Sequence, residues 1–215
     1  MTQFVAPRGG VARDFFARPA LDVAPELLGC VLRHNTFEGT VAVRISEVEA
    51  YMGEDDPGSH AFRGKTARNW AMFETGGHLY VYRHMGLHFC ANVVCGPADR
   101  AMGVLIRGGQ VVEGAQLARD RRARAGVVRH DRDLARGPAR LTVALGIDWG
   151  YNGHDLVGSS KLAVVYGDRH VDQTRSGPRV GVSGPGGDGT RFPWRFWLAD
   201  DPTVSLYRAV KPRSR

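Results

Sequence analysis

Hydrophobic and polar residues alternate along residues 40–51, and this alternation predicts a half-buried β-strand. Val41, Val43 and Ile45 share one face, with smaller or polar residues between them, and a period of two residues is what a pleated strand produces. Residues 30–34 have the same character, and a short polar stretch separates the two segments. The pattern therefore predicts two neighbouring strands joined by a turn.

A second alternating region, residues 78–94, predicts a β-hairpin. The stretches HLYVYR and HFCANVV flank a turn at 84–87, and Gly86 supplies the positive φ that a tight hairpin turn needs. Met85 stands beside this glycine. Its apolar side chain would lie at the exposed tip of the hairpin, where it has nothing of its own fold to pack against.

Shorter patterns predict the other elements. Pro138 suits the first position of a helix and Gly146 its end, which predicts a helix over 138–145. Residues 52–77 are rich in Gly, Asp, Arg and Asn, a composition typical of an irregular, site-forming loop. We also expect strands at 103–107, 161–166, 179–182 and 195–198. One helix is expected at 112–124, and a short helix capped by Asp22 is expected to run through 26–28 and end before Gly29. Residues 184–189 are expected to form a flexible loop.

These elements fit one domain. The 215 residues are 43% hydrophobic, which is enough to bury one sizeable core, and neither an internal repeat nor a long linker divides the chain. We expect a single α+β (mixed α/β) domain over 1–215, with a curved, largely antiparallel sheet flanked by helices and a protruding β-hairpin. Residues 1–12, with Pro7, Gly9 and Gly10, are expected to form a loose basic arm.

The chain is basic, and nearly all of its positive charge is arginine. Lys and Arg number 29 against 22 Asp and Glu, for a net charge of +7, and Lys65, Lys161 and Lys211 are the only lysines. This balance favours a polyanionic partner, either nucleic acid or an anionic membrane surface. An ordinary basic enzyme from a GC-rich genome would have the same composition, so charge alone leaves both interpretations open.

Cysteine usage and hydropathy indicate where the protein works. Cys30, Cys90 and Cys95 are an odd number and lack the spacing of a disulfide framework, which predicts a reducing compartment. No apolar stretch approaches the roughly 18 residues of a membrane-spanning helix, and the N-terminus lacks the apolar core of a signal peptide. We expect a cytoplasmic protein, associated with the nucleoid if the chain is bacterial, and no membrane contact.

Two carboxylates and a tyrosine are the first candidates for chemistry. Glu47, Glu49 and Tyr51 occupy alternate positions of the predicted strand, so they share a face and would line one wall of a cavity. Neighbouring carboxylates repel, which can raise the pKa of one and leave the other as a ready base. The alternative is a solvated acidic strand edge.

The predicted hairpin is the second candidate. Tyr80 and Tyr82 share one of its faces, and a ring that stacks an unpaired base contributes about 1–3 kcal/mol. Extruding a base from a duplex costs a few kcal/mol, and an apolar tip such as Met85 can act as a wedge between base steps. The alternative is a hydrophobic hairpin packed on the core. Arg107, which ends the apolar strand at 103–107, is a third candidate, with an ordinary surface arginine as its alternative.

Several longer motifs follow one another in a specific order. They are RISEVEAYMGEDDPGSHAFRGKTARNWAMF, GHLYVYRHMGLHFCANVV, GVLIRG, RGPARLTVALGID and RVGVSG. In this order the chain resembles the alkyladenine (methylpurine) DNA glycosylase family over residues 13–207. The resemblance implies a monofunctional enzyme that flips alkylated or deaminated purines out of double-stranded DNA and hydrolyses their N-glycosidic bond, leaving an abasic site. The damaged bases implied are 3-methyladenine, 7-methylguanine, hypoxanthine and ethenoadenine, and neither a metal nor another cofactor is implied.

The resemblance also implies a role for individual residues. Glu49 would activate the water that attacks C1′ of the sugar, with Arg107 and the backbone carbonyl of Val180 holding the same water. A carboxylate suits an oxocarbenium-like transition state, because it is both a base and a nearby negative charge.

The base pocket is implied in the same way. Tyr51 would stack on one face of the flipped base, and His60 and Tyr82 on the other. Such a slot favours electron-poor, often cationic alkylpurines, because aromatic faces attract cations. Asn92 matches the asparagine that crowds the exocyclic amine of guanine and so rejects the normal base.

The chain departs from the pattern of vertebrate members of the family at two positions. Met85 stands at the intercalating tip, where a tyrosine is familiar; methionine is flexible and apolar, so it fills the gap but stacks less well. Arg140 replaces the lysine of a G-P-x-K-L motif, a change that preserves a phosphate or structural contact.

Other functions fit the sequence less well. A zinc site at His84, His88, Cys90 and Cys95 lacks a second ligand pair, and the acidic run 54–56 lacks the ligand spacing of Mg²⁺ or Ca²⁺, so it is expected to be a solvated loop. A lyase would need an attacking amine, for which Lys65 is the only nearby lysine. The rival classes are a catalytically silent nucleic-acid-binding module on the same scaffold and an enzyme of small nucleosides. We expect a monomer.

Overall fold

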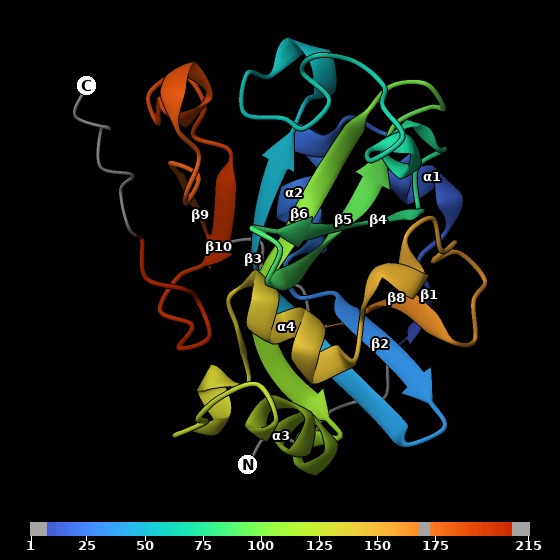
Figure 1. Cartoon of the computed structure of the whole chain (residues 1–215), viewed down its shortest axis with the longest axis vertical. Helices are drawn as coiled ribbons and strands as arrows, with labels where there is room; N and C mark the ends of the chain where they lie inside the picture. Colours follow the sequence, from blue (N-terminus) through green and yellow to red (C-terminus); the bar gives the residue numbers. More distant parts are fainter. Residues whose placement is uncertain (1–7, 168–172, 208–215) are drawn as a thin grey trace.

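A ten-stranded sheet organises the part of the chain that the structure, a computed structural model, describes: residues 8–167 and 173–207. Neighbouring strands are antiparallel throughout, and the main path runs β1-β8-β2-β3-β6-β5-β4. On its flanks β10 pairs with β3 and β9, and β7 pairs with β6 (Figure 1). The strands are β1 (Arg8–Gly10), β2 (Val31–Thr36), β3 (Gly39–Tyr51), β4 (Leu79–His84), β5 (His88–Cys95), β6 (Met102–Glu113), β7 (Ala135–Arg136), β8 (Leu162–Tyr166), β9 (Thr174–Gly177) and β10 (Arg195–Leu198).

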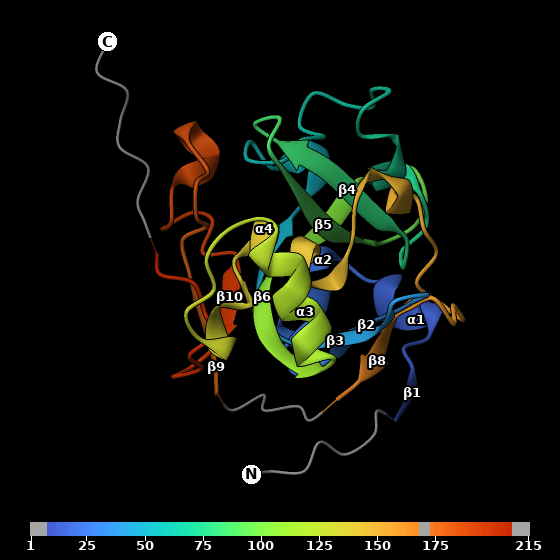
Figure 2. The same cartoon turned by 60° about the horizontal axis from the view of Figure 1, so that its bottom comes forward.

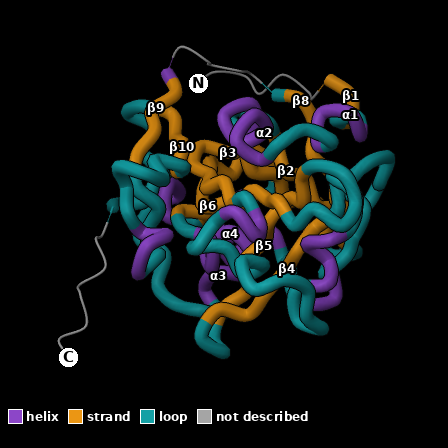
Figure 3. Tube along the Cα trace, turned by 90° about the horizontal axis from the view of Figure 1, so that it is seen from above, coloured by secondary structure: helices purple, strands orange, loops and turns teal. Residues whose placement is uncertain are grey.

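In the described ranges, four α-helices cover the two faces of this sheet. They are α1 (Arg13–Phe16), α2 (Ala20–Leu27), α3 (Ala115–Ala123) and α4 (Pro138–Leu145). α2 lies on one face and α3 and α4 on the other, as the front view and the view from above agree (Figures 1 and 3). The largest core cluster includes Val23 and Leu27 of α2 and Ile45 of β3. The expected α+β fold with a largely antiparallel sheet is thus confirmed. Within the described ranges, no helix is long and apolar enough to cross a membrane.

The long strand β3 is the centre of the sheet and brings distant segments together. Glu49 of β3 pairs with Leu105 of β6 on one side and with Arg195 of β10 on the other. Leu105 in turn pairs with Asn92 of β5, which pairs with Tyr80 of β4. Because residues paired across a sheet point to the same side, this row collects side chains from five strands on one wall.

Irregular pairing of β3 with β6 aims one more side chain, that of Arg107, at the same wall. Ser46 of β3 and Arg107 of β6 have no partner in the register, which shifts on either side of Glu47. An extra residue of this kind bends the strand and redirects its side chains. Gly109 permits the close approach of β6 to β3, since a Cβ there would lie 2.2 Å from the Arg44 carbonyl oxygen.

The predicted hairpin, the strand pair β2–β3 and the helix from Pro138 to Leu145 are confirmed, as is β10. β6 is longer than the expected strand at 103–107, because the glycines at 108 and 109 continue the pairing with β3 and β7 instead of ending it. The helix expected at 112–124 consequently starts only at Ala115.

Three further expectations need correction. The helix α2 begins at Ala20 after Pro19, so Asp22 lies in its first turn and does not cap it. Residues 179–182 form no strand: Gly181 has a φ of 78°, and the Val180 N–H bonds a side chain instead of a neighbouring strand. Part of the expected flexible loop, Gly184–Gly187, is a 3-10 helix.

The expected arm over residues 1–12 falls partly outside the described residues, which begin at residue 8. Arg8–Gly10 form β1 and pair with β8 instead of lying loose. Cys30, Cys90 and Cys95 are all buried and form no disulfide.

Candidate active site

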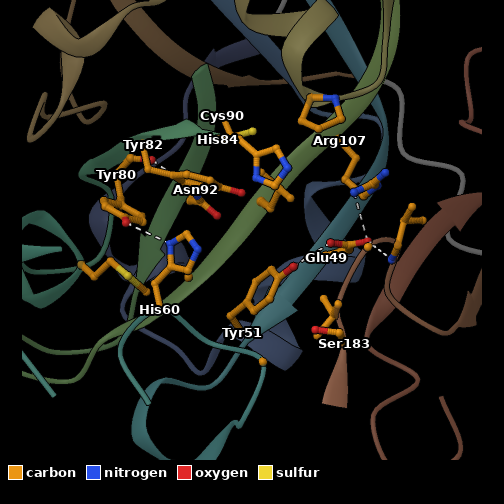
Figure 4. A pocket seen from close by; sticks show the side chains of 18 of the residues that line it. Glu49, Tyr51, His60, Tyr80, Tyr82, His84, Cys90, Asn92, Arg107 and Ser183 are labelled. Atoms are coloured by element: carbon orange, nitrogen blue, oxygen red, sulfur yellow. Dashed lines mark hydrogen bonds and ion pairs between the residues drawn. The ribbon is translucent and has the colours of Figure 1, made fainter. Parts of the chain in front are cut away.

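A cavity of about 470 Å³ opens on the face of the sheet where the row of paired residues ends. Its volume is within the range of pockets that bury a small planar ligand. Strands supply most of its wall, and the loops at 52–77 and 178–183 together with Pro138 of α4 supply the rest (Figure 4). Seven residues singled out from the sequence line it: Glu49, Tyr51, His60, Tyr82, Asn92, Arg107 and Val180.

Glu49 is fully buried at the base of this cavity and is surrounded by hydrogen-bond donors. Its Oε1 accepts the Val180 N–H over 2.7 Å and lies 3.2 Å from Nη1 of Arg107. Its Oε2 accepts the hydroxyl of Tyr51 over 2.8 Å. A carboxylate offers about four acceptor positions, so these three contacts leave room for one more donor, such as a water molecule.

Tyr51 keeps its hydroxyl proton in this arrangement. Burial, and then the negative charge of Glu49, raise the pKa of Tyr51 well above its ordinary value. The hydroxyl therefore donates to the carboxylate, and the ring is held with one edge against Glu49 (Figure 4).

Arg107 bridges the two glutamates of β3. Its Nε donates to Oε1 of Glu47 over 2.9 Å, while Nη1 faces Glu49. Burial alone would lower the pKa of Arg107, but the charges of Glu49 and Glu47 outweigh it and raise the pKa. The arginine is thus a fixed cation and not the surface residue that its sequence position also allowed.

The carboxylate of Glu47 accepts four hydrogen bonds from its neighbours. Besides Arg107 it accepts Nε of Arg195 at 2.7 Å, and the Ser205 N–H and Oγ at 2.7 and 2.8 Å. Burial raises the pKa of Glu47, but Arg107 and Arg195 bring a larger opposite effect, so the pKa is lowered. The expectation that repulsion would raise a pKa in this pair omitted both arginines. The solvated strand edge is also wrong, because Glu47 and Glu49 are both fully buried.

An aromatic cluster forms the opposite part of the cavity wall. The rings of His60 and Tyr82 lie 4.5 Å apart, edge to face, and Tyr82 stacks on Tyr80 at 5.7 Å. The Tyr80 hydroxyl lies 3.1 Å from Nδ1 of His60. Burial, together with the nearby His84, lowers the pKa of His60, so its imidazole is neutral at pH 7.

The loop that carries His60 is held by its own small core. Ala61, Met72 and Phe73 pack with Tyr80 of β4. The buried side chain of Asn69 donates to the carbonyl of His60 over 3.2 Å. These contacts fix the imidazole, although the loop between residues 52 and 77 has no strand and no α-helix.

Asn92 and Met85 complete the set predicted from the sequence. Asn92 is buried, and its Nδ2 donates to the Tyr80 carbonyl over 3.2 Å, which fixes the amide in the cavity wall. Met85 lies outside the cavity at the tip of the β4–β5 hairpin, where it is 81% exposed and has a φ of 50°. His84, next to it, lines the cavity, so the exposed tip stands close to the mouth.

Sequence reasoning missed a second buried arginine, Arg179. Its guanidinium lies 4.5 Å from the centroid of the Tyr51 ring and forms an ion pair with Asp56 at 2.5 Å, with both side chains fully buried. It also donates to the Gly186 carbonyl over 2.8 Å. Arg179 therefore joins the two loops at the rim, and Asp56 is part of the core and not of a solvated acidic loop.

Arg195 and Ser205 were missed as well, because nothing in their local sequence marks them. Only the pairing of β10 with β3 places Arg195 beside Glu47. Across the described ranges, no group of three or more His, Cys, Asp or Glu side chains is arranged to hold a metal ion.

The site combines a buried carboxylate fixed by an arginine with a cavity whose opposite wall is aromatic. A sequence model of the methylpurine-DNA glycosylase family matches residues 14–202. The chain is 53% identical over 211 residues to a protein of Streptomyces avermitilis, covering 97% of this chain and 96% of that protein. It is 55% identical over 201 residues to one of Leifsonia xyli, covering 91% and 92%. Both relatives are provisionally named 3-methyladenine DNA glycosylases.

The chain belongs to the methylpurine-DNA glycosylase family. The resemblance seen in its motifs is thereby confirmed. Family membership makes the protein a hydrolase of N-glycosyl bonds that acts in DNA base-excision repair.

Proposed function

We propose that this family member excises alkylated and deaminated purines from double-stranded DNA by activating water with Glu49. The observation that carries the proposal is the buried carboxylate of Glu49, which faces the cavity and whose protein contacts are all with donors. Such a carboxylate stays ready to accept a proton from a water molecule. The substrates proposed are 3-methyladenine, 7-methylguanine, hypoxanthine and ethenoadenine.

The proposed step is a hydrolysis that balances without a cofactor. The water oxygen forms a bond to C1′ of the sugar, the C1′–N bond breaks, and its electron pair leaves with the base. The water proton passes to Glu49. An alkylated purine that was cationic in the nucleotide leaves neutral, whereas a neutral purine such as hypoxanthine leaves as an anion and then takes up a proton from solvent. The product is an abasic sugar with a hydroxyl at C1′. The negative charge of Glu49 also stabilises the positive charge that develops on the sugar in the transition state.

Arg107 and Val180 are proposed to position the water. Nη1 of Arg107 and the Val180 N–H both approach Oε1 of Glu49, so both residues stand where the water would be held. The Val180 N–H already donates a hydrogen bond to Glu49. The Val180 carbonyl is then the proposed acceptor of a water hydrogen.

The base is proposed to stack between Tyr51 and the pair of His60 and Tyr82. A neutral imidazole and two tyrosine rings attract an electron-poor or cationic purine more strongly than a normal one. Asn92 is proposed to exclude guanine, because its amide is held in place by Tyr80. Met85 is proposed to fill the gap that the flipped nucleotide leaves in the duplex.

We infer a monomer that works as a single domain over residues 1–215, with cytoplasmic location. The net charge of +7 suits a DNA partner. The three cysteines without a disulfide suit a reducing compartment.

An excision panel tests the function. The protein is incubated in EDTA with duplexes that each carry one of the four lesions, and abasic sites are cleaved with alkali. Strand breaks at 3-methyladenine and at least one other lesion are expected, with none in the undamaged duplex. A silent binding module would bind these duplexes without breaking any. A nucleoside enzyme would act on the free damaged nucleosides equally well and show no dependence on salt.

A further inference from the structure

Arg122 is a buried arginine that has no hydrogen-bond or ion-pair partner in the part of the chain that the structure describes. It lies in the last turn of α3 and is only 6% exposed. Its Nε is enclosed and has no acceptor, and none of its guanidinium nitrogens bonds an acceptor within residues 8–167 and 173–207. The adjacent Arg121 is buried to a similar degree and donates to Glu38, Thr36 and the Leu145 carbonyl. The contrast sets Arg122 apart from the structural arginines of this fold.

A buried charge without a partner destabilises the protein that carries it. Burial, and next the positive charge of Arg140, lower the pKa of Arg122. Asp133 is close enough to oppose this effect in part, but its carboxylate faces Nη1 of Arg136 at 3.7 Å. Among the described residues, Asp133 therefore compensates the charge of this guanidinium only in part.

The amino-terminal end of α4 is near enough to Arg122 for the charge of Arg140 to act on it. α3 and α4 pack side by side (Figure 2), and Arg140, in the first turn of α4, is exposed. No side chain caps this end, and no acidic residue lies in its first turn. The N–H groups of Ala139 and Arg140 consequently have no helical partner, and the helix dipole favours an anion there.

This end of α4 is also part of the cavity mouth. Pro138, the first residue of α4, lines the cavity that holds Glu49. A nucleotide whose base enters the cavity must leave its sugar and phosphates outside, at the rim. Of the three guanidinium nitrogens of Arg122, Nε is the one enclosed without a partner, so its Nη end is the part that a ligand can reach.

We propose that Arg122, Arg140 and the first N–H groups of α4 bind a phosphodiester of the DNA backbone next to the flipped nucleotide. A phosphodiester matches the site because its two free oxygens accept both a guanidinium and helix N–H groups. The bound phosphate supplies the negative charge that Arg122 lacks in the free protein. This site rests on the proposed function for its ligand, but its chemistry requires only duplex DNA.

Arg122→Met gives two readouts that move in opposite directions. Methionine keeps the apolar stem and removes the unpaired charge, so the melting temperature of the free protein is expected to rise. Affinity for an undamaged duplex is expected to fall, and the slope of log K against log salt is expected to shrink by about 0.9. Arg140→Met is expected to reduce the slope equally without raising the melting temperature. The control is Arg124→Met, an exposed position on the same turn, which should change neither quantity.

The opposite pattern overturns the proposal. A structural arginine would give a lower melting temperature and an unchanged salt slope in Arg122→Met. Inorganic phosphate serves as the second arm: if it stabilises the wild type but not Arg122→Met while the DNA slopes are equal, the site binds free anions and not DNA. Because the slopes are measured on undamaged duplex, they stay informative even if the excision panel shows no glycosylase activity.

Discussion

Nε of Arg107 donates a hydrogen bond to Oε1 of Glu47 over 2.9 Å. The bond orients the guanidinium so that Nη1 lies 3.2 Å from Glu49. The two glutamates of the E-V-E motif therefore differ in function, although they share one face of β3. Glu47 fixes the arginine and takes up the donors of Arg195 and Ser205, while Glu49 keeps its contact with the cavity.

Glu47→Gln is expected to slow single-turnover excision by about 10- to 100-fold, because Arg107 loses the anchor that aims it at Glu49. Removing the charge of Glu47 from its buried contacts with Arg107 and Arg195 is also expected to lower the free energy of unfolding by about 3–5 kcal/mol. The measurements are a single-turnover time course and a urea titration.

The pH dependence of stability follows from the same contact. The folded protein lowers the pKa of Glu47 below its ordinary value near 4.5, so the unfolded state binds the proton more readily. The stabilisation is complete above that ordinary value and is lost as the pH falls through the lowered one. Glu47→Gln should abolish this part of the acid sensitivity. The control Glu113→Gln removes a half-exposed pair with Arg33 and should cost less than about 1 kcal/mol; equal losses in both variants would contradict the account.

The lowered pKa of His60 predicts that cationic and neutral lesions are excised with a different dependence on pH. Its lowered pKa keeps the imidazole neutral at pH 7. As the pH falls below the ordinary value of 6.5 and through the lowered one, an imidazolium forms and repels a cationic alkylpurine. We expect the ratio of 3-methyladenine to hypoxanthine excision to fall on acidification. Taking the ratio cancels the titration of any group that affects both substrates. A ratio that stays constant over the whole acid range in which the protein remains folded would reject this role, and His60→Gln should make it constant.

The exposed tip of the hairpin is the basis of another prediction. Met85→Ala should weaken binding to a lesion duplex more than binding to an undamaged one, because only the flipped state needs the gap to be filled. Fluorescence of a duplex containing ethenoadenine measures the flipped fraction directly. Phe37→Ala is the matched control, since Phe37 is fully exposed at the turn between β2 and β3. Equal losses on both duplexes would rule out the wedge.

The elements with a clear period or a clear terminus could be predicted from the sequence. The alternation of hydrophobic and polar residues predicted β3, and Pro138 and Gly146, at the two ends of a helical segment, predicted α4. The boundary between β6 and α3 could not be predicted, because Gly108 and Gly109 resemble a strand end. Their role is to let β3 and β7 approach closely, a tertiary effect without a local signal.

The candidate site divides in a similar way. The motifs identified the residues that line the cavity, and the strand register explains why Glu49 and Asn92 belong to one row. Their individual roles stay predictions. Arg179 and Arg195 could not be found, because each pairs with a carboxylate more than 100 positions away. In this arginine-rich chain, composition alone could not separate buried arginines from those on the surface.

Glu49→Gln tests the central claim most directly. Glutamine keeps the size of the side chain and removes the base, so binding to a hypoxanthine duplex is expected to stay near the wild-type value. The single-turnover excision rate is expected to fall by at least about 100-fold, the scale of a lost general base. The measurement is abasic-site formation under enzyme excess, alongside binding to the same duplex. A variant that binds normally and no longer excises is the predicted result, and excision at a near wild-type rate would contradict the assignment of Glu49.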